Sequence, residues 1–251
     1  MKPAAAIAVV LALAAAAPAD ARTQTARLGA VRASYTFGKN FKPGTLRIWN
    51  RGRLIVSRRA YTYDLVRGRI LFVRQLDGAG PPEVLLNLYS GGAHCCSESW
   101  IYTRAKRARK QWGHGEAPPL RDDDRDGRPE FHGYDTSFAY AFGSFGGSRF
   151  PAKVWRYERS AVRDVSASFP AEIEADMTSH LAAYNEAVTA GDAEGVRAAL
   201  AAYAADAKVL GRLDEAMAVV YAAIDAGQTG DGVTESQADF LATLKRLVGV
   251  P

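Results

Sequence analysis

The stretch that decides the fold of this chain reads Asp122-Asp123-Asp124-Arg125-Asp126-Gly127-Arg128-Pro129-Glu130. Carboxylates occupy its first, third, fifth and ninth positions, and glycine occupies the sixth. Because a tight loop can turn alternate side chains inward, this spacing suits a hard cation such as Ca2+, which takes roughly six to eight oxygen ligands. Gly127 permits the sharp turn that lets the aspartates converge. We refer to residues 122–130 as the acidic loop.

The acidic loop therefore predicts a calcium site. Its expected ligands are the carboxylates of Asp122, Asp124, Asp126 and Glu130 and the backbone carbonyl of Arg128. The twelfth position is Gly133, not the glutamate that closes an EF-hand, so we expect strands on both sides of the loop. Extracellular calcium modules bind with Kd values of about 10⁻⁴–10⁻³ M, so about 1 mM ion would stabilise the fold by about 1.4 kcal/mol. The alternative is a solvated acidic turn.

The charges of the chain divide it into two parts. The 251 residues are 48% apolar and 24% charged, which is typical of a globular protein. Residues 22–165 hold 26 Lys and Arg against 13 Asp and Glu, whereas residues 166–251 hold 5 against 13. The opposite signs of net charge indicate two domains. Either the domains dock on each other through complementary electrostatic fields, or each is simply kept soluble by its own charge.

The N-terminus has the pattern of a secretory signal peptide. Met1-Lys2 supplies a positive start, the apolar run Ala4–Ala17 is too short to span a bilayer, and Ala19-Asp20-Ala21 offers a small-x-small cleavage site. We predict that residues 1–21 are removed and that the protein is exported to the periplasm or beyond, without a membrane span. A retained anchor is the alternative. Residues 22–30 read as an unstructured leader.

Residues 31–169 read as an antiparallel β-rich domain, a sandwich or a partial propeller. Short runs rich in β-branched and aromatic residues alternate with glycine turns, at spacings of about eight to fifteen residues. The expected strands are 31–37, 45–49, 53–63, 69–74, 83–89, 99–103, 138–142 and 153–157.

The acidic loop has a degenerate copy earlier in the chain. Residues 75–84 align with residues 122–131, which lie 47 residues later, and this period is near the length of a propeller blade. The positions that match Asp122 and Asp126 are Gln75 and Ala79, so we expect the first copy to hold no ion. Two copies cannot close a propeller, which favours an open array.

The pattern changes to helix after Phe169-Pro170. Ile173, Met177, Leu181, Tyr184 and Val188 form one helical stripe. Gly191 is expected to end this helix, and Asp192 to cap the next. We predict an α-helical domain of about four helices over residues 170–251, and hence an α+β multidomain protein.

The β half resembles the FG-GAP or VCBS-type repeats of exported bacterial proteins, whose calcium loops also occur in integrin propellers. The motifs that carry the resemblance, over roughly residues 60–170, are Gly91-Gly92-Ala93-His94-Cys95-Cys96, Trp112-Gly113, the acidic loop with Pro129-Glu130-Phe131, and Asp164-Val165 before Phe169-Pro170. The resemblance implies a calcium-stabilised β module. Arg125 departs from the glycine or asparagine of the family pattern, and the helical part lies outside the resemblance.

The adjacent pair Cys95-Cys96 holds the two cysteines of the chain. In an oxidising compartment the pair favours a vicinal disulfide that locks a turn, although adjacent Cα atoms, about 3.8 Å apart, are closer than usual for a disulfide. Two buried thiols are one alternative. A metal or redox site with His94 is another, opposed by the tendency of neighbouring side chains in a strand to point to opposite faces.

The run Arg104-Ala-Lys106-Arg107-Ala-Arg109-Lys110 places five cations between Tyr102 and Trp112. This run could bind a polyanion. The alternative is that it forms the solvated tip of a hairpin. Export argues against nucleic acid as the partner.

These features together favour a non-enzymatic, calcium-stabilised binding or scaffold module of the cell envelope, with an unknown protein or an anionic envelope polymer as its partner. The alternative is a periplasmic redox or metal-dependent enzyme that uses His94, Cys95 and Cys96. No HExxH, GxSxG or phosphate-binding glycine loop is present in the sequence.

Overall fold

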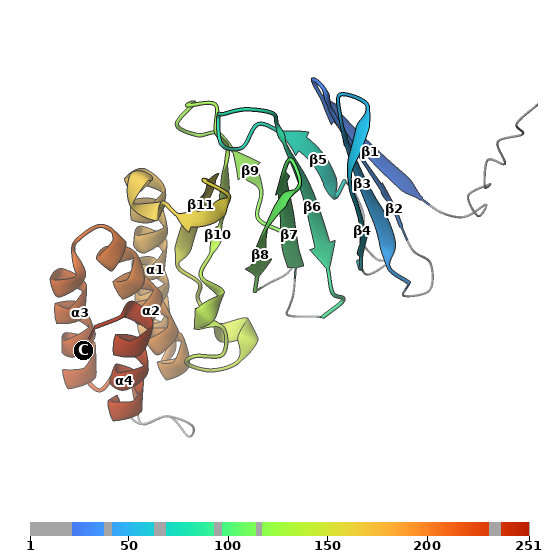
Figure 1. The fold of residues 1–251 in the computed structure, drawn as a ribbon. Helices are drawn as coiled ribbons and strands as arrows, with labels where there is room; N and C mark the ends of the chain where they lie inside the picture. Colours follow the sequence, from blue (N-terminus) through green and yellow to red (C-terminus); the bar gives the residue numbers. More distant parts are fainter. Residues whose placement is uncertain are drawn as a thin grey trace, which may run out of the picture.

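The chain folds into three antiparallel β-sheets of four strands each, followed by four α-helices. This computed structural model describes residues 22–37, 42–62, 69–92, 97–113, 117–230 and 237–250. Sheets and helices follow one another in a row, in the order of the sequence (Figure 1). The predicted α+β class, with a β-rich region before a helical bundle, is confirmed.

The first sheet is a meander in which each strand pairs with the next one along the chain. Its strands are β1 (Thr23–Leu28), β2 (Val31–Thr36), β3 (Gly44–Asn50) and β4 (Arg53–Ala60). The expectation of an unstructured leader is wrong for Thr23–Leu28. This strand has no apolar run, but it pairs with β2 along its whole length, and the Gln24 side chain accepts hydrogen bonds from the backbone of Ile70 and Leu71.

The second and third sheets repeat the same meander. The second contains β5 (Leu71–Arg74), β6 (Glu83–Tyr89), β7 (Ser97–Thr103) and β8 (Lys106–Trp112). The third contains β9 (Leu120–Arg121), β10 (Glu130–Tyr134), β11 (Ala152–Glu158) and β12 (Ala161–Asp164). All three sheets thus contain four antiparallel strands, each paired with its neighbour along the chain.

The second sheet is the central layer of the β region. Val84 and Leu86 of β6 belong to a core shared with the first sheet, whereas Leu85 belongs to a core with Phe131 and Trp155 of the third sheet. Because both faces of β6 are covered, the strand carries the consecutive apolar residues Val84-Leu85-Leu86 and does not alternate there.

One predicted strand is absent. Residues 138–142 were expected to form a strand, but the chain makes a 3-10 turn over Thr136–Phe138 and then bends. Phe138 and Phe142 are buried in the core of the helices, where Phe142 packs edge-on against Phe240 with ring centroids 5.4 Å apart. The spacing of apolar residues over 138–142 therefore reflects the packing of this segment against the helices, and not the alternation of a strand.

The helices are α1 (Pro170–Ala190), α2 (Ala193–Val209), α3 (Leu213–Asp225) and α4 (Gln237–Val248). Pro170 lies in the first turn of α1, where a missing N–H costs nothing. Gly191 ends α1 in the left-handed conformation, and the Asp192 side chain accepts a hydrogen bond from the N–H of Gly195, as predicted. Within the described residues, no helix is both long and apolar enough to cross a membrane.

Candidate functional site

The acidic loop joins β9 to β10, and its last residue, Glu130, begins β10. The degenerate copy joins β5 to β6 in the second sheet in the same way. The register matches as well, because Arg121 lies opposite Glu130 and Arg74 lies opposite Glu83. The two segments thus occupy equivalent places in neighbouring sheets.

Hydrogen bonds from the backbone shape the acidic loop. Asp122 accepts from the N–H of Gly127 at 3.1 Å, Asp124 from the N–H of Asp126 at 3.2 Å, and Asp126 from the N–H of Arg128 at 2.8 Å. Gly127 has a φ of 82°, the left-handed conformation that glycine adopts without strain. The turn is therefore formed by the chain's own donors and acceptors.

Three of the predicted ligands converge. Carboxylate oxygens of Asp122, Asp124 and Glu130 lie within 4.8 Å of one another. The Glu130 side chain is fully buried, and its Oε2 atom has no hydrogen-bond partner among the described residues. Burial raises the pKa of Glu130, and the hydrogen bond from Arg156 opposes this only in part. A buried carboxylate oxygen without a donor is costly unless a cation faces it.

The other two predicted ligands contact each other. The guanidinium of Arg128 binds Asp126 Oδ2, with Nη2 at 2.6 Å and Nε at 3.0 Å. Desolvation acts to raise the pKa of Asp126, but the hydrogen bonds from Arg128 outweigh it and lower the pKa. Asp126 is thus not among the three converging carboxylates, although Arg156 Nη2 also lies 3.5 Å from its Oδ2. The role of the Arg128 carbonyl as a ligand stays a prediction.

Arg156 of β11 is a member of the site that the sequence did not indicate. Its Nη2 lies 2.7 Å from Asp124 Oδ2, and its Nε lies 2.5 Å from Glu130 Oε1. Only the pairing of β11 with β10 brings Arg156 to the loop, because the two strands are separated by a long connection. One fixed cation thus offsets part of the negative charge of the acidic loop.

Glu83, the counterpart of Glu130, is satisfied by the protein alone. It is fully buried, and its Oε2 accepts from the N–H of Leu76 at 2.9 Å while its Oε1 accepts from the Thr103 hydroxyl at 3.1 Å. Both carboxylate oxygens of Glu83 therefore have donors, whereas only Oε1 of Glu130 has one among the described residues.

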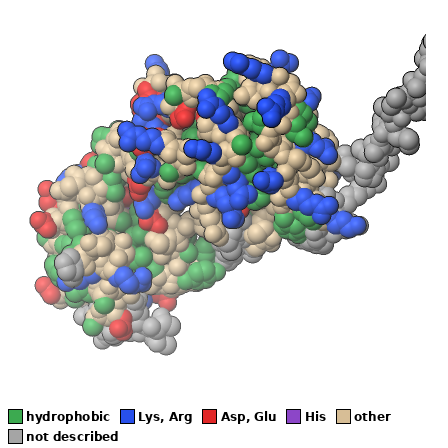
Figure 2. Space-filling view, viewed as in Figure 1, with side chains coloured by type: hydrophobic (Ala, Val, Ile, Leu, Met, Phe, Trp, Pro, Cys, Tyr) green, Lys and Arg blue, Asp and Glu red, His purple; other side chains and the backbone are tan. Residues whose placement is uncertain are grey.

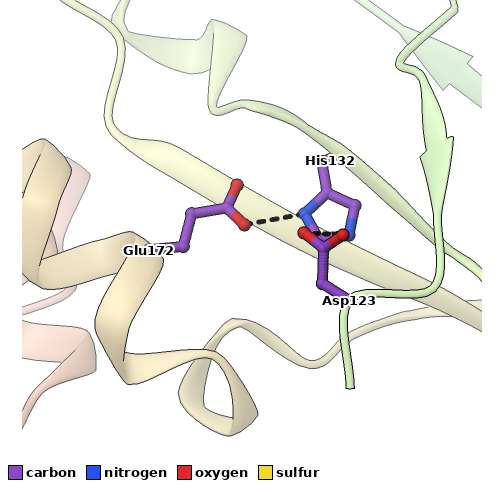
Figure 3. A group of neighbouring side chains, drawn as sticks. All are labelled: Asp123, His132 and Glu172. Atoms are coloured by element: carbon purple, nitrogen blue, oxygen red, sulfur yellow. Dashed lines mark hydrogen bonds and ion pairs between the residues drawn. The ribbon is translucent and has the colours of Figure 1, made fainter. Parts of the chain in front are cut away.

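The remaining aspartate of the loop, Asp123, lies in a second cluster with His132 and Glu172 (Figure 3). His132 comes from β10 and has a side chain only 2% exposed, and its Nδ1 lies 2.7 Å from Glu172 Oε2. Its Nε2 faces Asp123 Oδ2 at 3.9 Å. Because Glu172 belongs to the first turn of α1, the cluster connects the acidic loop and the third sheet with the helices.

Arg121 supplies the positive charge of this second cluster. Its guanidinium lies 3.1 Å from Asp123 Oδ2 and 3.1 Å from Glu172 Oε2. The Phe169 ring packs edge-on against His132 with centroids 5.5 Å apart. The sequence did not indicate Glu172. A carboxylate in the first turn of a helix is favourable to the helix dipole, and this much follows from the sequence. That this carboxylate contacts His132, 40 residues earlier in the chain, does not follow from it.

His132 also helps to line a pocket of about 430 Å³. Its lining includes Lys110, Trp112, Asp135, Lys153 and Trp155. The Lys110 ammonium lies 5.0 Å from the centre of the Trp155 ring. Burial, followed by the charge of Lys153, lowers the pKa of Lys110. Lys153 is paired with Asp135 at 2.8 Å, so its charge is already offset. The aromatic faces and the Lys110 ammonium suit a ligand that carries negative charge.

The basic run occupies a turn and an edge strand. Arg104 lies in the turn of the β7–β8 hairpin, as a hairpin tip requires, but Lys106–Lys110 belong to strand β8. The Arg107 guanidinium carbon lies over the Trp100 ring, 4.4 Å from the ring centroid, so this side chain packs against the sheet. Lys and Arg side chains gather over the sheets on the face drawn in Figure 2 and are fewer over the helices.

The cysteine pair and two of the histidines cannot be placed in this fold. His94, Cys95, Cys96 and His114 lie outside the described residues. The predicted vicinal disulfide therefore stays a prediction, and so does the alternative metal or redox site.

Comparison with known proteins gives one match of partial length. A probable thylakoid lumen protein of Synechocystis sp. is 33% identical over 156 aligned positions, which cover 58% of this chain. The match spans 45% of the relative, so just under half of that protein corresponds to this chain. No family model matches, and no solved structure matches.

Proposed function

We propose that this chain is an exported, non-enzymatic module of the cell envelope, stabilised by Ca2+ and acting as a binding or scaffold protein for an anionic partner. The observation that carries the proposal is the difference between Glu130 and Glu83. Two equivalent buried glutamates end two equivalent loops, yet only Glu130 has a carboxylate oxygen without a donor among the described residues.

The donor set fits calcium. Asp122, Asp124 and Glu130 would hold the ion, and carboxylates are the ligands that Ca2+ prefers. Asp126 would join them if its carboxylate exchanged Arg128 for the ion. Bound calcium would supply positive charge at the buried oxygen of Glu130, in addition to the charge of Arg156. Its role is structural, because the loop fixes the start of β10.

Export is supported by the signal-like N-terminus and by the relative. A lumen lies across a membrane from the compartment of protein synthesis, as the periplasm does, so a lumenal relative favours export of this chain too.

An anionic polymer of the envelope is the partner that the charges favour. Arg104, Lys106, Arg107 and Arg109 are exposed on one hairpin, and the pocket that His132 helps to line adds Lys110. Such a surface attracts polyanions at a distance, with a strength that falls as salt rises.

The calcium proposal is tested by thermal melting of the purified protein in Ca2+ and in EGTA. We expect about 1 mM Ca2+ to raise the Tm by about 3–6 °C, from a gain of about 1.4 kcal/mol. Glu130→Gln should abolish this rise. The matched control is Glu83→Gln, which alters the equivalent glutamate and should leave the calcium response intact.

Two results would contradict the calcium role: a wild-type Tm that does not respond to Ca2+, or equal responses in Glu130→Gln and the wild type.

A further inference from the structure

A third group of ionisable side chains lies among the helices, away from the acidic loop. Asp176 and His180 are four residues apart on α1 and so share one face of that helix, and Asp206 comes from α2. His180 Nε2 lies 3.1 Å from Asp176 Oδ2 and 3.7 Å from Asp206 Oδ2. Two facing helices thus bring one imidazole and two carboxyl groups to a single point.

The group is buried and lacks donors. The Asp206 side chain is fully buried and the His180 side chain is 7% exposed. Neither oxygen of Asp206 has a hydrogen-bond partner among the described residues, and Nδ1 of His180 has none there either. Asp176 is oriented by the N–H of Ala152, which donates to its Oδ2 at 2.7 Å.

No arginine or lysine among the described residues pairs with these two carboxyl groups. This distinguishes the group from the two other acidic clusters, where Arg156 contacts Glu130 and Arg121 contacts both Asp123 and Glu172. A buried carboxylate without a partner is strongly unfavourable, so the site requires either a proton or a cation. Burial, followed by the neighbouring Asp176 carboxyl group, raises the pKa of Asp206 to about 9, against the lowering effect of the Ala152 N–H.

We propose that Asp176, His180 and Asp206 form a binding site for a divalent transition-metal ion, which links α1 to α2. An imidazole nitrogen with carboxylate oxygens is a donor set that zinc takes readily. Ligand atoms about 2.0–2.1 Å from a tetrahedral zinc ion lie roughly 3.3 Å apart, and the separations of 3.1 and 3.7 Å bracket this value.

The fold supports this site in two further ways. Metal sites inside helical bundles are commonly built from inward-facing side chains on neighbouring helices, as here. The Ala152 N–H orients a ligand from the start of β11, as outer-shell donors do in metal sites. A bound ion would therefore hold α1, α2 and the start of β11 together. This proposal is independent of calcium binding in the acidic loop.

The test is zinc binding by the untagged full chain after removal of metal with EDTA. Isothermal titration should give one Zn2+ per chain, and saturating zinc should raise the Tm by about 5–10 °C. Asp206→Asn, which replaces the carboxyl group by an amide of similar shape, should weaken zinc binding by at least about 10–100-fold. Loss of an outer-shell partner alone weakens metal binding by this much. His180→Gln should do the same and serves if the first variant does not fold.

Two controls separate this site from other zinc ligands in the chain. His132→Gln alters the histidine of the cluster beside the acidic loop, and a Cys95→Ser, Cys96→Ser double variant removes both thiols. Both should keep the zinc affinity and the rise in Tm of the wild type. The proposal is overturned if the wild type binds no zinc, if Asp206→Asn and His180→Gln bind it as tightly as the wild type, or if binding is lost in either control.

Discussion

At the scale of single residues, the acidic loop depends on two features of different origin. Gly127 provides a local backbone conformation, whereas Arg156 provides a charge from a distant strand. The first is a property of the turn itself. The second exists only because β11 pairs with β10. The two features predict different consequences of substitution.

Gly127→Ala should destabilise the protein through backbone strain alone. A Cβ atom at Gly127 would meet no heavy atom within 4 Å, but the φ of 82° is unfavourable for alanine by about 1–2 kcal/mol. Gly146→Ala is the control, because that glycine has equally open surroundings and no positive φ. Urea denaturation of both variants checks the difference, and equal stabilities would contradict it.

Arg156→Met should leave Glu130 buried beside Asp124 without its fixed cation. We expect a loss of about 3 kcal/mol in the absence of calcium, the usual cost when one partner of a buried ion pair is removed. Calcium should recover part of this loss, because it brings positive charge to the same carboxylates. Arg163→Met is the matched control, since Arg163 lies opposite Arg156 in β12 and is 54% exposed. Unfolding in urea with Ca2+ and with EGTA measures both effects.

At the scale of elements, the cluster of Asp123, His132 and Glu172 connects the third sheet with α1. A double-mutant cycle with His132→Gln and Glu172→Gln should give a coupling free energy of about 0.5–3 kcal/mol, as expected for side chains in direct contact. The cycle formed by His132→Gln and Glu186→Gln, in which Glu186 lies farther along α1, should give none. A coupling near zero in the first cycle would show that the contact does not stabilise the junction.

Asp135 stabilises the turn that follows β10, with a dependence on pH. Its carboxylate lies 2.8 Å from Lys153 Nζ and accepts hydrogen bonds from Ser137. Desolvation acts to raise its pKa, but the hydrogen bonds from Lys153 and Ser137 outweigh it, and the pKa is lowered from 3.8. The stabilisation is therefore present above pH 3.8 and is lost as the pH falls through the lower value in the folded protein.

Asp135→Asn should therefore lower the stability at pH 7 by about 1 kcal/mol. The gap between variant and wild type should narrow as the pH falls below about 4, where the wild-type carboxylate takes up its proton. Urea denaturation at a series of pH values checks this, with Asp225→Asn on the last turn of α3 as the control. A gap that stays constant with pH would show that the charge of Asp135 is not involved.

At the scale of the whole molecule, the separation of charge would decide which end meets the anionic partner proposed above. The sheets carry the excess of Lys and Arg, and the helices carry the excess of Asp and Glu (Figure 2). Arg104→Glu with Lys106→Glu should weaken binding to an anionic polymer such as lipopolysaccharide, and raising the salt should weaken binding by the wild type. Lys245→Glu with Arg246→Glu on α4 is the matched control and should have a smaller effect. Cosedimentation measures both, and equal losses would contradict the assignment to the sheets.

The sequence by itself determined the features that depend on neighbouring residues. These include the turn of the acidic loop, the glycine that ends α1, the aspartate that caps α2 and the change from strand to helix at Phe169-Pro170. Each follows from local backbone preferences or from a periodic pattern, so no knowledge of the fold was needed.

Only the tertiary structure decided which distant residues meet. It paired β1 with β2 despite the absence of an apolar run, and it placed Phe138 and Phe142 in the helical core instead of a sheet. It brought Arg156 to the acidic loop and Glu172 to His132. The physical reason is that a local pattern specifies what a segment can bury or bind, whereas its partner is set by strand register and layer packing, which involve the whole chain.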